Sequence, residues 1–91
     1  FEGTGITKVV LPERLTDIAE KMFLECRKLE SIYIPKAVQT IGKEAFKDCS
    51  LRDVYYGGNE EQWKQLVRDH EELNYITPHY NSSALLATLS L

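Results

Sequence analysis

Two cysteines, Cys26 and Cys49, are the side chains of this sequence best suited to covalent or metal chemistry. A thiolate can attack a substrate, bind zinc or form a disulfide. Zinc sites built on cysteine normally contain a C-x-x-C pair or nearby histidines, and neither accompanies these two residues. We therefore favour two buried thiols that form no bond, and a disulfide between them remains the alternative.

Two histidines are the other candidates for chemistry. His70 precedes Glu71 and Glu72 and lies nine positions before His79, in a segment predicted as loop and strand. The simpler interpretation at this spacing is a pair of surface histidines. The sequence contains no Ser-His-acid grouping, no glycine-rich phosphate loop and no H-E-x-x-H motif. It therefore predicts no catalytic residue, no metal site, no cofactor and no enzyme activity.

The elements that position these residues follow from a repeat of 23 positions. The matched pairs are Ile6 and Leu29, Pro12 and Pro35, Ile18 and Ile41, Phe23 and Phe46, and Cys26 and Cys49. Self-similarity at roughly 20–50 residues is typical of a solenoid, in which units stack because none can bury its apolar face alone. Stacked strands lie roughly 4.8 Å apart, so Cys26 and Cys49 would come within reach of a disulfide. Thr4 occupies the same column, which favours a small buried side chain instead.

The repeat divides the chain into the end of a preceding repeat, two full repeats, a divergent capping repeat and an unassigned tail, at residues 1–5, 6–28, 29–50, 51–80 and 81–91. Because the chain opens in mid-repeat, we interpret it as a fragment. Ile6, Val9 and Leu11 would then belong to a first strand whose backbone edge and apolar neighbours are uncovered. We expect upstream repeats, or self-association with a second copy, to cover that edge.

Within each unit the apolar pattern changes in a fixed order. In the second unit, apolar residues at 29, 32 and 34 predict a short strand, which Pro35 ends by removing a backbone donor. A second apolar pair follows at 38 and 41, and Gly42 predicts a turn. The i, i+1, i+4 spacing of apolar residues over 43–49 then predicts one or two helical turns.

The segment after the second unit predicts a cap over the last repeat. Asn59 is a suitable N-cap for a helix over about 60–68, and Gln62 would complete a capping box. Trp63 shares a face with the apolar residues one turn later, so this face should close the open end of the stack. Residues 75–80 predict a final strand on either side of a proline.

The motif Leu-x-x-Ile-x-Ile-Pro-x-x-Val-x-x-Ile-Gly-x-x-Ala-Phe-x-x-Cys is complete over 29–49 and nearly complete over 6–26. It resembles the BspA-like leucine-rich repeat of bacterial surface proteins, and residues 54–63 resemble a terminal unit of that family. Ala19 and Met22 depart from the pattern. The resemblance implies an α/β solenoid with short parallel strands, short helical turns and a C-terminal capping helix.

The resemblance also implies a location and a role. Members are extracellular or attached to the cell surface, and their repeats act as adhesion modules or as structural spacers. It does not imply an enzyme. Because members differ in what they bind, the resemblance leaves the partner open between a protein and a glycan, of host or matrix origin.

The outward side chains of the strands form the candidate binding face. If positions 29, 32 and 34 point inward, Tyr33 points outward in a row with Val10 and Tyr55, and such tyrosines favour recognition. Glu30 and Arg52 place opposite charges on neighbouring strands. The candidate ligand-binding residues are Val10, Glu30, Tyr33, Arg52, Asp53 and Tyr55. The alternative is ordinary cross-strand pairing with no ligand.

Composition limits the partners. With 91 residues, 43% hydrophobic and 27% charged, the chain is the size of one small domain. A net charge of -3 provides no positive field for phosphate backbones, so nucleic acid is not an expected partner. The longest apolar tract, at 84–91, is far shorter than the roughly 20 residues of a membrane-spanning helix.

Overall fold

The fold is given by a computed structural model that describes residues 5–70, 73 and 76–83. These residues form short strands and one helix. In chain order they are β1 (Lys8–Val10), β2 (Asp17–Ile18), β3 (Ser31–Ile34), β4 (Thr40–Ile41), β5 (Asp53–Tyr56) and α1 (Glu60–Leu66). The predicted preceding repeat at 1–5 and the tail at 81–91 lie mostly outside the described residues.

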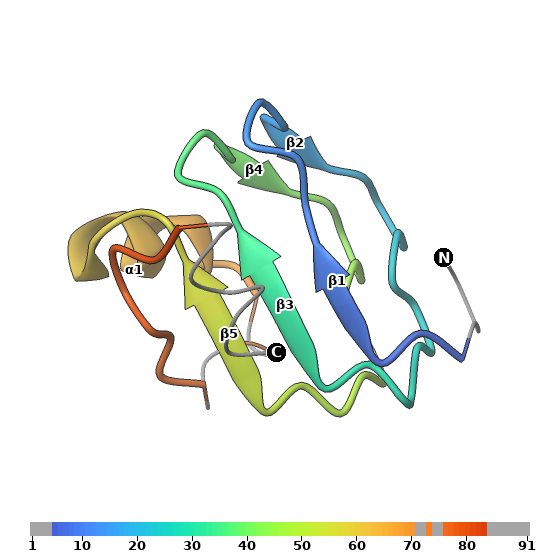
Figure 1. Cartoon of the computed structure of the whole chain (residues 1–91). Helices are drawn as coiled ribbons and strands as arrows, with labels where there is room; N and C mark the ends of the chain where they lie inside the picture. The colour runs from blue at the N-terminus through green and yellow to red at the C-terminus, as the bar shows by residue number, and fades with distance from the viewer. Residues whose placement is uncertain (1–4, 71–72, 74–75, 84–91) are drawn as a thin grey trace.

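Each strand pairs in parallel with the equivalent strand of the next unit. One sheet has the order β1-β3-β5 and the other pairs β2 with β4, as Figure 1 shows. Val9, Ile32 and Val54 lie opposite one another in the first sheet, and Ile18 lies opposite Ile41 in the second. The predicted parallel strands are therefore confirmed, and the described strands form no closed sheet.

The core is built from the apolar columns of the repeat. The three predicted inward positions, Leu29, Ile32 and Ile34, are fully buried. The rings of Phe23 and Phe46 stack with centroids 5.2 Å apart and an interplanar angle of 11°. Equivalent side chains in successive units thus pack directly on one another, and each unit completes the core of the next.

Residues 43–49 form a series of turns, so the prediction of helical turns there is wrong. The amide of Ala45 donates to the Gly42 carbonyl at 3.2 Å, and similar i to i+3 bonds follow. Glu44 and Asp48 have φ values of 60° and 61°, and their equivalents in the preceding unit, Lys21 and Glu25, have the same conformation. A left-handed residue in each turn prevents the chain from continuing as a helix.

A second ladder of hydrogen bonds explains this conformation. Amides of one unit donate to carbonyls of the next unit, with lengths of 2.8–3.0 Å, in the pairs Lys21 to Lys43, Phe23 to Ala45 and Glu25 to Lys47. A helix would use those carbonyls for its own bonds. The stack instead satisfies buried backbone groups between units, which an isolated turn segment cannot do.

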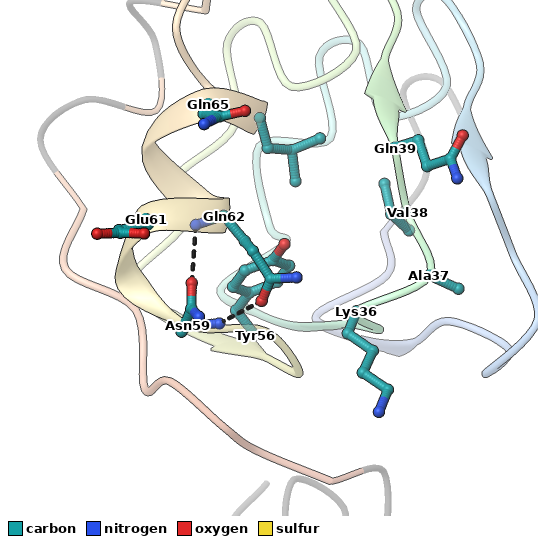
Figure 2. Close-up of a pocket in the computed structure, with 10 residues that line it drawn as sticks. Lys36, Ala37, Val38, Gln39, Tyr56, Asn59, Glu61, Gln62 and Gln65 are labelled. Atoms are coloured by element: carbon teal, nitrogen blue, oxygen red, sulfur yellow. Dashed lines mark hydrogen bonds between the residues drawn. The ribbon is translucent and has the colours of Figure 1, made fainter.

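The predicted capping box is present at the start of α1. The backbone amide of Gln62 donates to the side-chain oxygen of Asn59 at 2.9 Å, and the backbone amide of Asn59 donates to the side-chain oxygen of Gln62 at 2.8 Å (Figure 2). The helix ends at Leu66, slightly before the predicted end. Trp63 is buried from this helix against Tyr56, with ring centroids 5.3 Å apart. The helix therefore packs on the last strand of the sheet.

The two edges of the three-stranded sheet differ. The outer edge of β5 is covered, because the Tyr56 amide donates to the His79 carbonyl at 3.0 Å and the His79 amide donates to the Val54 carbonyl at 2.8 Å. Of the predicted final strand, Tyr75 lies outside the described residues. No described strand pairs with the outer edge of β1. The side chains there are less exposed than predicted, since Leu11 is buried and Val9 packs against the core.

Gly42 is required by the close approach of successive units, which predicts a large cost for Gly42→Ala. A Cβ at this position would lie 2.6 Å from the carbonyl carbon of Ala19 and closer still to the backbone nitrogen of Glu20. We expect a loss of about 1–3 kcal/mol in the free energy of unfolding, measured by urea denaturation. Gly5→Ala is the matched control, because nothing lies within 4 Å of its added Cβ. Equal midpoints for the two variants would contradict the close approach.

Trp63→Ala tests the cap. Because the ring is buried between α1 and Tyr56, its removal should cost about 3–5 kcal/mol, a large part of the stability of so small a domain. Lys64→Ala on the exposed side of the same helix should change the unfolding free energy by no more than about 0.5 kcal/mol. A Trp63→Ala melting temperature within a few degrees of the parent would show that α1 does not close the core.

Candidate functional site

The strand register places the predicted aromatic row as expected. Val10, Tyr33 and Tyr55 are direct neighbours on β1, β3 and β5. Their exposure differs, however. Val10 is 42% exposed, Tyr55 is half-buried, and Tyr33 is only 2% exposed. The row therefore exists, but its central tyrosine offers almost no surface to a partner.

The burial of Tyr33 corrects the expectation that its side chain points into solvent. Its strand lies between the other two, and its hydroxyl donates to the Glu13 carboxylate at 2.9 Å, beyond the end of β1. Gly57 leaves room for the hydroxyl, since a Cβ there would lie 3.2 Å from it. Burial, assisted by the bond to Glu13, raises the pKa of Tyr33 to about 12. Tyr33 thus joins β3 to the loop after β1.

Tyr55 forms a surface cluster with two polar residues. Its ring stacks on that of His79, with centroids 4.7 Å apart and an interplanar angle of 17°. The His79 Nε2 atom lies 3.9 Å from an oxygen of Asp53, and the two form an ion pair when the histidine is protonated. The side chains of both remain more than half exposed. The cluster presents an aromatic ring, a carboxylate and an imidazole at the covered edge of the sheet.

Sequence reasoning missed His79 as a member of this surface. The sequence alone favours an ordinary surface histidine, but the backbone of this residue extends the sheet beside Tyr55. The sequence signal was the expected strand over 75–80, which placed residue 79 near the last strand of the stack. No pattern of residue types indicates the stacking itself.

Glu30 and Arg52 are exposed, but their side chains form no ion pair within the described residues. Their link is through the backbone, because the Arg52 amide donates to the Glu30 carbonyl at 2.8 Å. The alternative of a cross-strand ion pair is therefore not seen among the described residues, and both side chains are exposed.

Cys26 and Cys49 are not joined in a disulfide, and the prediction of burial holds for Cys26 but not for Cys49. Cys26 is buried, and Cys49 is half-buried with its Sγ donating to the Phe23 carbonyl at 2.9 Å. Burial raises the pKa of Cys49 to about 11. It therefore carries almost no thiolate at neutral pH, and the thiolate is the reactive form.

The described residues hold no group of three or more metal-ligating side chains. The acidic neighbours of His70, at 71–72, lie outside the described part of the chain. Among the helices that the structure describes, none is long and apolar enough to cross a bilayer.

Comparison with known families identifies the repeat. The family described as the BspA type leucine rich repeat region (6 copies) matches residues 1–74. The chain belongs to this family. BspA-type repeats are protein-interaction or repeat modules, generally without enzyme activity and typically extracellular or on the cell surface. Neither the search of curated proteins nor that of solved structures finds a match.

Tyr33→Phe tests the structural role of the buried tyrosine. At neutral pH the loss of its hydrogen bond should cost about 0.5–1.5 kcal/mol. Above its ordinary pKa of 10, the unfolded chain loses the phenol proton while the folded chain retains it up to about pH 12. The parent should therefore lose stability as the pH rises from 10 to 12, and Tyr33→Phe should lose less. Urea denaturation across this range measures both slopes, and equal slopes would show that the phenol is not buried.

Proposed function

We propose that this chain is a non-enzymatic adhesion module of a secreted or surface-attached bacterial protein. It binds a protein or glycan of host or matrix origin through the exposed strand face. Here the strand face means Val10, Glu30, Arg52, Asp53 and Tyr55, together with His79. Membership of the BspA-type family supports an interaction module, and the exposed groups of the strand face support where the partner lies.

The observation that carries this proposal is the Asp53, Tyr55 and His79 cluster. A stacked pair of rings is rigid, so it offers contact area with little loss of side-chain entropy on binding. The exposed charges of Glu30 and Arg52 lie directly before β3 and β5, on neighbouring strands of the same sheet. Together they provide an aromatic anchor with polar surroundings, which is the usual anatomy of a recognition surface.

The proposed architecture is a solenoid whose repeats divide at residues 28 and 50, with residues 51–80 as the divergent capping repeat. The parallel pairing of equivalent strands supports this division. In a solenoid the outer edge of β1 is where another repeat, or a second copy of the chain, would pair. Self-association through that edge is part of the proposal.

Arg52→Glu and Tyr55→Ala test the strand face. Binding of the parent to immobilised extracellular-matrix proteins and to a glycan array identifies the partner, and each variant should then weaken that binding about tenfold or more. Lys64→Glu on α1 is the matched control, since it changes the net charge as Arg52→Glu does. Light scattering over the same concentrations separates binding from self-association. If Arg52→Glu and Lys64→Glu weakened binding equally, the effect would come from the net charge, and the strand face would be excluded as the binding site.

The alternative is a structural spacer with no ligand of its own. The burial of Tyr33 favours it, because the aromatic surface of the row is reduced to Tyr55. A spacer would show no binding in any arm of this experiment, while Trp63→Ala would still unfold it. A partner that depends on Arg52 and Tyr55 would exclude the spacer.

A further inference from the structure

A polar pocket of about 550 Å³ lies away from the aromatic row, between α1 and residues 36–39. Figure 2 shows residues of the helix on one side, residues 36–39 on the other, and Tyr56 between them. Residues 36–39 are held in place because the backbone amide of Gln39 donates to the Thr16 carbonyl at 2.7 Å. The helix side is fixed by the capping box at Asn59. Both walls of this pocket are therefore anchored.

Tyr56 leaves a polar group unsatisfied in this pocket. Its side chain is 2% exposed, yet within the described residues nothing hydrogen-bonds to its hydroxyl. A buried tyrosine hydroxyl usually has a partner, so this one points to a group that the described residues do not supply. Burial raises the pKa of Tyr56, so the hydroxyl keeps its proton and remains a donor as well as an acceptor.

Amide side chains dominate the polar lining. The residues Gln39, Asn59, Gln62 and Gln65 line the pocket, although the Gln39 side chain points away from the helix (Figure 2). The capping box uses the side-chain oxygens of Asn59 and Gln62. The side-chain amide of Gln65 has no hydrogen-bond partner among the described residues. A primary amide donates and accepts at once, as a hydroxyl group does. The lining therefore suits a ligand with several hydroxyl groups.

Charge and apolar area narrow the ligand class further. The charged residues of the lining, Lys36 and Glu61, have opposite signs, so the pocket region carries no net charge that would favour an anion. Ala37, Val38 and Leu66 add apolar surface for C–H groups. A cavity of 550 Å³ falls within the range of roughly 300–1,000 Å³ that holds small ligands.

We propose that this pocket binds an uncharged sugar residue, with the Tyr56 hydroxyl and the side-chain amide of Gln65 bonded to its hydroxyl groups. The pocket is separate from the strand face, and sugar binding here does not require that face to bind anything. A sugar that fills the pocket would touch both α1 and residues 36–39, and so would bridge the cap and the repeat beneath it.

The test is a titration of the ¹⁵N-labelled chain with D-glucose, D-galactose, D-mannose and N-acetyl-D-glucosamine, followed by NMR chemical shifts. At least one of these sugars should shift the amides of residues 36–39 and 56–65 in a saturable way. Tyr56→Phe removes one hydroxyl and Gln65→Ala removes one amide, and each should weaken binding about tenfold. Lys64→Ala, on the same helix but outside the pocket lining, should bind as the parent does.

Several results would overturn the proposal. They are no saturable shift with any sugar, shifts confined to other surfaces, or equal affinity for the parent and Tyr56→Phe. Tighter binding of glucose 6-phosphate than of glucose would exclude an uncharged ligand. Because the Tyr56 hydroxyl has no partner within the described residues, Tyr56→Phe should melt with the parent in the absence of sugar. A clearly lower melting temperature would show that the hydroxyl is satisfied internally and would remove the basis of the site.

Discussion

The direct contact of each backbone segment with its equivalent in the next unit governs this structure. At Gly42 the approach leaves no room for a Cβ against residues 19 and 20, and the amide of Phe23 donates to the Ala45 carbonyl at 2.8 Å in the next unit. These contacts bury backbone groups that no single unit could satisfy. They also fix the register in which Phe23 stacks on Phe46, so the apolar core follows from the backbone ladder.

A stack held together in this way must be ended by something other than another repeat. At the β5 edge, residue 79 supplies the backbone bonds and Trp63 supplies the apolar cover. Both come from the divergent part of the chain. The same segment creates the Tyr55 and His79 pair and one wall of the polar pocket. The end of the stack thus carries features that an internal repeat has no means to form.

The sequence predicted the parts of the fold that depend on local chemistry or on the repeat itself. The buried positions Leu29, Ile32 and Ile34 follow from apolar periodicity, and the capping box follows from the spacing of Asn59 and Gln62. The turns over 43–49 were not predicted, because their left-handed residues include Glu44 rather than glycine. Their conformation depends on hydrogen bonds to another unit, and the spacing of apolar residues does not predict such bonds.

The candidate surface was harder to predict for a related reason. Alternation along β3 correctly places the Tyr33 and Ile32 side chains on different faces of the sheet. It does not say whether an outward side chain stays exposed. Tyr33 is buried because Glu13, which precedes it by almost one repeat, accepts its hydroxyl bond, and because Gly57 leaves space for it. Both causes lie outside the strand.

The contrast between repeated and non-repeated side chains indicates which residues could give this chain specificity for a partner. Apolar side chains that recur at the inward positions of the repeat are used in packing, as Phe23 and Phe46 are, so they cannot distinguish one partner from another. Tyr56 does not repeat its column, because its register partner in the preceding strand is Ile34. The isoleucine side chain has no polar atom that needs a hydrogen bond, whereas the tyrosine has a hydroxyl. This hydroxyl, which has no partner within the described residues, lies where a repeat column changes from aliphatic to aromatic next to the capping helix. If the proposed binding holds, departures from the repeat are therefore the positions where a partner would meet side chains that the internal repeats lack.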